Sequence, residues 1–365
     1  MFRITAINTI RIGIALGDAV HLSSGTIAKS DSVLVRITDD RGRIGWGEAS
    51  AAPAMTGETS PGMISAISFM AVRLQEQVIE NTASIDTIIG QTIYGNPAAK
   101  SALSIALYDL AGKHLNLPIF DLLGGKKRDR ATLIWRISGA DKEIETAYQR
   151  RDEGFVSFKV KVATNPPDTD LERSYSARTA VGRDVTVSAD ANGGYSTEDG
   201  LYFARMAGDA GLDFLEQPVS GDNLAGMTNC ANTATIPIGA DEGLHGLDTI
   251  TLHHKIGAAS GGSLKPIKFG GLSQVMEAAD LMGRLSMHVN LAGKAGDSSV
   301  SSAAIAHLAL ALPELNWHTN ITNHYLIGDV ASNPIKITHG HVLPPDGPGL
   351  GIDVDEDLIS RYRAR

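Results

Sequence analysis

Eight short apolar runs, each followed by a helical pattern, occupy the chain after Gly124 and Gly125 and constrain its fold most. The runs are TLIWRIS, FVSFKVKV, DVTVSAD, LDFLEQP, IPIGAD, GGSLKPIK, SMHVNLA and LNWHTNI. Their step of about 25 residues is the repeat of a (β/α)₈ barrel. An open doubly wound sheet has the same local pattern, but the number of units and the lack of a Gly-x-Gly-x-x-Gly after the first strand favour the barrel. We predict an α/β fold with a TIM-type barrel over residues 124–326.

The segments on either side of this repeat have a different pattern. Two alternating runs, ITAINTIRIGI and SDSVLVRITDDRGRIGWGEAS, predict antiparallel strands with a turn at residues 39–42. A helical pattern follows, clearest in residues 98–115. We therefore expect an α+β capping domain over residues 1–123. Residues 327–365 are too many for the last barrel helix alone, and we expect them to return to the capping domain.

Composition excludes several classes of protein. The chain has 32 basic and 41 acidic residues, a net charge of −9, which argues against a nucleic-acid or anionic-membrane partner. Its only cysteine, Cys230, excludes an intramolecular disulfide framework and a multi-cysteine metal site. The Met1 end lacks the apolar segment of a signal peptide, and no apolar stretch approaches the roughly 20 residues of a membrane span. These features predict a soluble, cytoplasmic protein.

Charged residues stand where successive barrel strands are predicted to end. In a barrel, such positions face the active site. The spacings from Lys161 onward are 29, 26, 25 and 24 residues, each close to one βα step. Lys159 shares a strand face with Lys161, because residues two apart point to the same side. The full series is Lys159, Lys161, Asp190, Glu216, Asp241 and Lys265.

This series has a simple electrostatic interpretation. Buried lysines need nearby negative charge, which the carboxylates on the next three strands supply. Those carboxylates repel one another and call for a cation, and oxygen ligands without Cys or His suit Mg²⁺ or Mn²⁺. Taken alone, each Asp could be a helix cap and each Lys a solvated surface charge. Five such residues at successive strand ends favour an active site that uses a metal and no organic cofactor.

With these residues identified, the chain resembles the enolase superfamily, specifically its muconate lactonizing enzyme subgroup. The resemblance covers nearly the whole chain. The motifs that carry it are KVK at 159–161, DAN at 190–192, EQP at 216–218, DE at 241–242, K-x-x-K-x-G-G from Lys265, GWGE at 45–48, YDLAGK at 108–113 and PGLG-x-D-x-D at 348–355.

The resemblance implies a role for each residue of the series. It implies that Asp190, Glu216 and Asp241 bind one Mg²⁺. Lys161 and Lys265 would be acid/base groups on opposite faces of the substrate, with Lys159 as the electrostatic partner of Lys161. The reaction would remove a proton α to a carboxylate, and a divalent ion would stabilise the resulting ene-diolate. The resemblance also implies a homo-oligomer, from a dimer to an octamer.

Two departures from the subgroup bear on the substrate. Dipeptide-racemising members carry an Asp-x-Asp at the eighth strand, and muconate-cyclising members tend to have a Glu nearby. Here the segment reads NWHTNITNHY and has no acid. At the seventh strand, Lys294 could bind a second acidic group of the substrate and Asp297 an amine, or the two could form an ordinary loop pair. Trp317 could stack on the substrate, although packing inside the barrel is favoured.

Specificity in this subgroup is expected from the capping domain. Two segments rich in small and polar residues, Gly17–Ser30 and Ser50–Pro61, are predicted to be mobile loops over the barrel mouth. His21, Met55 and Thr56 are their candidate substrate contacts, with an exposed loop of no ligand role as the alternative.

The favoured function is 1,1-proton transfer, the racemisation or epimerisation of an amino-acid-like carboxylate, because a lysine on each face can remove and return a proton. Cycloisomerisation of a muconate-like diacid and dehydration of a hydroxy acid are the alternatives among enzymes. A barrel that binds a carboxylate without turnover is the alternative from another class. The expected partner is a small-molecule carboxylate.

Overall fold

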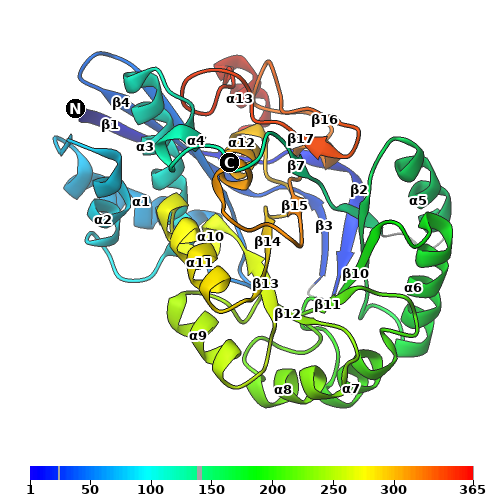
Figure 1. Cartoon of the computed structure of the whole chain (residues 1–365). Coiled ribbons are helices and arrows are strands. Elements are labelled where there is room, and N and C mark those ends of the chain that lie inside the picture. The colour runs from blue at the N-terminus through cyan, green and yellow to red at the C-terminus, as the bar shows by residue number, and fades with distance from the viewer. Residues whose placement is uncertain (24, 138–141, 365) are drawn as a thin grey trace.

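Eight parallel strands form the central barrel (Figure 1). The structure is a computed structural model that describes residues 1–23, 25–137 and 142–364. Neighbouring strands follow chain order, and a parallel bridge between Leu133 and Thr319 brings the first and last together. Each predicted apolar run contains one strand, so the predicted barrel is confirmed. The strands are β8 (Trp135–Ile137), β9 (Ser157–Lys161), β10 (Thr186–Asp190), β11 (Phe214–Glu216), β12 (Ile238–Ala240), β13 (Gly261–Leu264), β14 (His288–Ala292) and β15 (Thr319–Asn320).

Helices pack around the outside of the barrel (Figure 1). In α11 (Leu272–Arg284), for example, Leu272, Val275, Ala279 and Met282 are buried and recur at the three- and four-residue spacing of one helix face. A short extra helix, α10 (Pro266–Phe269), follows β13 directly. No helix among the described residues is both long and apolar enough to cross a membrane. The other outer helices are α5 (Glu143–Asp152), α6 (Pro167–Val181), α7 (Thr197–Met206), α8 (Leu224–Thr233), α9 (Leu247–Lys255) and α12 (Ser299–Ala311).

The N-terminal segment forms an antiparallel sheet in the order β5-β4-β1-β6 with helices beside it. The predicted turn at residues 39–42 joins β4 to β5, and the Asp39 carboxylate stabilises it by accepting the backbone N–H groups of Arg41 (2.9 Å) and Arg43 (2.8 Å). The strands are β1 (Phe2–Ile12), β4 (Ser32–Asp39), β5 (Ile44–Ser50) and β6 (Val78–Ile79), and the helices are α1 (Ser60–Leu74), α2 (Ile85–Gly90), α3 (Pro97–Leu115) and α4 (Ile119–Leu122), with a 3₁₀ turn at Thr82–Ser84.

A hairpin occupies Gly17–Ser30, so the prediction of a mobile loop there is wrong. Strands β2 (Ala15–Leu22) and β3 (Gly25–Lys29) pair antiparallel, with Val20 opposite Ile27. The apolar positions around Val20 and Ile27 alternate as strands do, but the many small residues of this segment indicated a loop instead. The hairpin reaches the barrel mouth, where the Ser23 hydroxyl lies 3.1 Å from the carbonyl oxygen of Asn192.

The C-terminal segment contacts both parts of the molecule. Strand β17 (His341–Val342) pairs with β16 (Ile337–Thr338) and with β7 (Ala131–Thr132), which directly precedes the barrel. After α13 (Glu356–Tyr362), the chain runs beside β1. There the Gly13 N–H donates to the Tyr362 carbonyl at 2.9 Å, and the Ala364 N–H donates to the Arg11 carbonyl at 2.9 Å.

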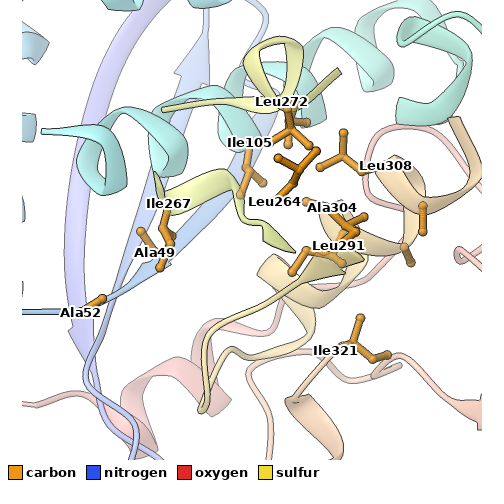
Figure 2. Close-up of a cluster of buried hydrophobic side chains, with 14 of the residues drawn as sticks. Ala49, Ala52, Ile105, Leu264, Ile267, Leu272, Leu291, Ala304, Leu308 and Ile321 are labelled. Atoms are coloured by element: carbon orange, nitrogen blue, oxygen red, sulfur yellow. The ribbon is translucent and has the colours of Figure 1, made fainter. Parts of the chain in front are cut away.

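One apolar core joins the N-terminal sheet to the barrel. Figure 2 shows side chains from β5, α3, β13, β14 and α12 packed in a single cluster. Helix α3 packs flush on β5 because Gly45 and Gly47 leave no side chain between them. The labelled members of the cluster are Ala49, Ala52, Ile105, Leu264, Ile267, Leu272, Leu291, Ala304, Leu308 and Ile321.

A polar contact joins the same two parts. The buried Glu48 carboxylate, at the end of β5, accepts the backbone N–H groups of Ser298 and Ser301 at the start of α12, each at 3.1 Å. Nearby, the Ser50 hydroxyl donates to the Asp297 carboxylate at 2.6 Å. Burial, together with the charge of Asp297, raises the pKa of Glu48 to about 8. We call Glu48, Ser50, Asp297 and Ser298 the interdomain latch.

The close contact between β5 and α3 gives a stability prediction. A Cβ at Gly47 would overlap the Ala102 carbonyl oxygen and lie 2.7 Å from the Ala106 nitrogen. We expect Gly47→Ala to lower the free energy of unfolding by about 1–3 kcal/mol through overpacking. Gly90→Ala is the control, because no atom lies within 4 Å of its added Cβ. Urea denaturation measures both, and equal effects of the two changes would refute the flush packing.

The latch gives a pH prediction. A carboxyl whose pKa is raised on folding contributes stability that is present at acid pH and lost as the pH rises through its folded pKa. The free energy of unfolding of the native protein should therefore fall from about pH 5 to pH 8, by up to about 1 kcal/mol per pH unit. Glu48→Gln should flatten this decline. Urea denaturation of the native protein and of Glu48→Gln at several pH values tests this prediction. Parallel pH profiles for these two proteins would contradict a raised pKa of Glu48 beside Asp297.

Candidate active site

The sequence-predicted series lies at one end of the barrel. Parallel register places Lys161 beside Asp190, and Asp190 beside Glu216. Lys159 and Lys161 share the inner face of β9, as the alternation of strand side chains requires. A cavity of about 420 Å³ opens there between the barrel and the N-terminal segment. Its lining includes Lys159, Lys161, Asp190, Glu216, Lys265 and Lys294 from the barrel, and Met55 from the segment after β5.

Each carboxylate of the series is paired with a lysine. Glu216 pairs with Lys159, and Asp190 with Lys161 at 2.5 Å. Asp241 lies just behind the cavity wall and pairs with both Lys265 and Lys268. These buried pairs replace solvent as the source of stabilisation for the charges.

The pairs shift the ionisation of their members. Burial alone would raise the pKa of Asp241, but the charges of Lys265 and Lys268 outweigh it and hold the pKa well below its usual range. Burial likewise opposes the charged forms of Lys159 and Lys265. The carboxylates beside them overcome this effect and raise the pKa of both lysines. As arranged here, the pairs favour the protonated forms of Lys159 and Lys265 and the ionised forms of Asp190 and Asp241.

The two predicted acid/base lysines face each other across the barrel. Strands β9 and β13 are separated by β10, β11 and β12 in one direction and by β14, β15 and β8 in the other. Side chains from their ends therefore approach the centre of the mouth from opposite sides. This arrangement can place one amine on each face of a substrate carbon.

The donor set of the three carboxylates fits a hard divalent cation. Asp190, Glu216 and Asp241 end neighbouring strands and offer only oxygen atoms. In this structure they turn to the lysines, and no three His, Cys, Asp or Glu side chains of the described residues are grouped closely enough to hold an ion. Glu242, next to Asp241, also has a carboxylate oxygen that lacks a hydrogen-bond partner among the described residues. This oxygen, Oε2, is buried, and burial and the charge of Asp241 raise the pKa of Glu242 to about 7.

Sequence reasoning gave no role to three polar residues of the site. Asn192 accepts a hydrogen bond from the Lys161 amine (2.8 Å) and donates to Glu242 (3.1 Å), so it links two cavity residues. Gln217 accepts the backbone N–H of Asp241 at 2.7 Å, which fixes the start of the loop after β12. Lys268 donates a hydrogen bond to the Asp241 carboxylate at 2.7 Å. All three belong to the DAN, EQP and K-x-x-K motifs, so these motifs could have identified them as site residues.

Two residues proposed from the capping segments lie outside the cavity lining. His21 is exposed and contacts Thr26 through its Nδ1 at 3.0 Å. Thr56 accepts the Glu58 N–H at 3.3 Å within its own turn. Met55 does line the cavity, with its sulfur 3.8 Å from the Lys265 amine. Of the three candidates, the structure brings only Met55 to the lysines.

Trp317 packs inside the lower end of the barrel. It stacks on Phe214, with ring centroids 4.0 Å apart, and on His288 at 5.0 Å. Both partners stand at the amino-terminal ends of their strands, away from the cavity. Gly239 and Gly261 leave the room for its indole. These contacts favour the packing interpretation, and Trp317 is not among the residues that line the cavity.

Asp297 belongs to the interdomain latch, and its present contacts favour a structural role over contact with a substrate amine. Its carboxylate accepts the Ser50 hydroxyl (2.6 Å) and the Lys294 backbone N–H (2.8 Å). The side chain is 1% exposed and does not reach the cavity lining. The sequence does not reveal this role, because the partner Ser50 lies 247 positions away from Asp297.

Comparison with known proteins extends over the whole chain. Residues 142–358 match the family described as enolase C-terminal domain-like, and residues 6–124 match the mandelate racemase/muconate lactonizing enzyme N-terminal domain. The chain is 30% identical to the N-succinyl-L-Arg/Lys racemase of Bacillus cereus, over 98% of this chain and 97% of the relative.

Solved structures agree with these matches. Muconate lactonizing enzyme from Pseudomonas fluorescens, complexed with muconolactone, has a TM-score of 0.95 and 28% identity, with both chains fully covered. Dipeptide epimerase from Cytophaga hutchinsonii, complexed with Mg and D-Ala-L-Val, has a TM-score of 0.91 and 28% identity over 99% of this chain and 98% of its own. The chain therefore belongs to the mandelate racemase/muconate lactonizing enzyme family and is an isomerase of the enolase superfamily.

Proposed function

We propose that the protein is a Mg²⁺-dependent isomerase that abstracts the α-proton of a small carboxylate and forms an ene-diolate. Within that chemistry, we propose racemisation or epimerisation of an amino-acid-type substrate. The observation that carries the proposal is the position of Lys161 and Lys265 on opposite sides of the mouth. One amine removes the proton from one face, and the other returns a proton to the opposite face.

In this proposal, Asp190, Glu216 and Asp241 hold the metal, with Mn²⁺ as a substitute. When bound, the metal stabilises the negative charge that develops on the substrate carboxylate. Support comes from the all-oxygen donor set on adjacent strands and from a structural neighbour solved with Mg. Lys159, buried beside Glu216, adds positive charge on the same side of the cavity.

A lysine must lose a proton before it can act as a base. Asp241 stabilises the protonated amine of Lys265 while its oxygen faces that amine and raises the pKa of Lys265. Asp190 forms an ion pair with Lys161. Ligation of Asp241 to a metal would weaken its contact with Lys265, so the Lys265 amine would lose its proton more readily. The lysine–carboxylate pairs thus link metal ligation to base strength.

Two further reactions suit the same residues. Cycloisomerisation of a muconate-like diacid needs only one lysine, and a muconate lactonizing enzyme is among the structural neighbours. Dehydration of a hydroxy acid also begins with α-proton removal. A carboxylate-binding barrel without turnover is disfavoured, because a pair of opposed buried lysines costs free energy that simple binding does not require.

We propose the division into a capping domain of residues 1–123, a barrel of residues 124–326 and a returning segment of residues 327–365. The contacts of the returning segment with β1 support it. The homo-oligomer and the cytoplasmic location stay predictions.

The lysine variants give the sharpest test of the mechanism. Substrates are found by incubating the protein with Mg²⁺ and a carboxylic-acid library in D₂O, and NMR follows deuterium at the α-carbon. We expect Lys161→Ala to lower turnover in both directions by about 10²–10⁴-fold, the usual contribution of one proton-transfer group. Lys265 should still exchange the α-proton of the enantiomer that it faces, and Lys265→Ala should show the mirror pattern.

Three outcomes of this experiment contradict the proposal in different ways. Full turnover by Lys265→Ala excludes two bases and favours cycloisomerisation or dehydration. Lactone absorbance without inversion identifies a cycloisomerase. Absence of exchange with every acid favours a binding protein.

The metal assignment has its own prediction. Asp190→Asn and Glu216→Gln should each weaken Mg²⁺ binding at least roughly tenfold, because each removes a charged oxygen ligand. Asp209→Asn, which changes an exposed carboxylate on the outer surface, is the matched control and should bind normally. Calorimetry measures the affinities, and circular dichroism checks the fold. Unchanged affinity in both site variants would refute the assignment.

A further inference from the structure

The cavity lining contains a half-buried lysine, Lys294, whose amine forms no ion pair within the described part of the chain. Lys159, Lys161, Lys265 and Lys268 each pair with a carboxylate. Lys294 also lines the cavity, but no carboxylate oxygen of the described residues lies within 4 Å of its amine. It is therefore a cation in a partly dry site that is available to a ligand.

The backbone of Lys294 is held firmly while its amine stays free. Its N–H donates to the Asp297 carboxylate at 2.8 Å, and its carbonyl accepts the Thr322 hydroxyl at 2.7 Å. Asp297 is itself fixed by Ser50 of the N-terminal sheet at 2.6 Å and by Ser301 at 3.1 Å. These contacts occupy the oxygens of Asp297, so the nearest acid in sequence does not neutralise the lysine.

The surroundings of Lys294 disfavour its charged form. Burial, followed by the positive charges of Lys265 and others, lowers the pKa of Lys294 to about 8. Bringing an anion to this amine would offset the cost of its burial and form a charge-assisted hydrogen bond. Binding of a negatively charged ligand group beside Lys294 is therefore favoured.

Topology separates this cation from the proposed metal ligands. Lys294 follows β14, whereas Asp190, Glu216 and Asp241 end β10, β11 and β12, and β13 with Lys265 lies between them. A substrate whose reacting carboxylate sits near the three acids would place a different group beside Lys294.

We propose that Lys294 is a specificity-determining residue that binds a second anionic group of the substrate, away from the reacting carboxylate. The substrate class is a small acid with a second carboxylate or an equivalent oxyanion. This inference rests on the proposed function for the position of the reacting carboxylate, but its test needs no turnover.

The test compares two inert acids of equal chain length, glutarate and pentanoate, which differ by one carboxylate. Calorimetry with Mg²⁺ present measures the affinity of the native protein and of Lys294→Met, Lys294→Gln and Lys294→Arg. The native protein should bind glutarate roughly ten to a hundred times more tightly than pentanoate, as one charge-assisted contact supplies. Lys294→Met and Lys294→Gln should lose this preference with pentanoate affinity unchanged. Lys294→Arg should retain most of it.

The matched control is Lys255→Met, which removes an exposed lysine at the end of α9 and should bind like the native protein. Thermal unfolding checks that each variant is folded, and two neutral variants guard against one that is not. Equal affinities of the native protein for the two acids, or a glutarate preference that survives in Lys294→Gln, would overturn the inference. Failure of the proposed function appears separately, as absence of α-proton exchange with any acid.

Discussion

Mutual neutralisation of charge at the mouth of a closed barrel is the interaction on which this structure depends. Lys159, Lys161, Lys265 and Lys268 are buried or nearly so, and each forms an ion pair with Asp190, Glu216 or Asp241. Parallel register places Asp190 beside Lys161 on one neighbouring strand and beside Glu216 on the other. In the proposed mechanism, the same ion pairs make the base strength of the lysines depend on what else the carboxylates bind. Fold and proposed chemistry are therefore joined through one set of ion pairs.

The N-terminal segment completes this mouth and does more than cover it. Its apolar residues share a core with β13, β14 and α12 (Figure 2). Its latch residues Glu48 and Ser50 contact Ser298 and Asp297, which follow Lys294 in the chain. Met55 approaches Lys265 from the same segment. A change in the capping sheet can therefore alter a barrel residue that lines the cavity. This coupling explains why specificity in such a fold need not reside in the barrel alone.

Sequence alone predicted the features that depend on period and spacing. Eight apolar runs gave eight strands, and the regular interval from Lys161 to Lys265 placed five charges at one end of the barrel. Features that depend on long-range contacts were missed. Asp297 looked like a ligand because Ser50, its partner, is distant in sequence. The hairpin over Gly17–Ser30 looked like a loop because Ser23 and Gly25 obscured the alternation on either side. For Trp317, the sequence favoured packing inside the barrel, but it could not identify the stacking partners Phe214 and His288, which lie on other strands.

In the proposed mechanism, the three carboxylates now shared among the lysines bind one divalent cation. Anomalous X-ray diffraction from a crystal soaked in Mn²⁺ tests this claim directly, because it locates the ion independently of any activity. The account predicts one strong anomalous peak at the barrel mouth, with oxygens of Asp190, Glu216 and Asp241 about 2.0–2.3 Å away, as expected for hard oxygen ligands. A peak elsewhere, or a mouth that stays empty while the lysines keep their carboxylates, would contradict it.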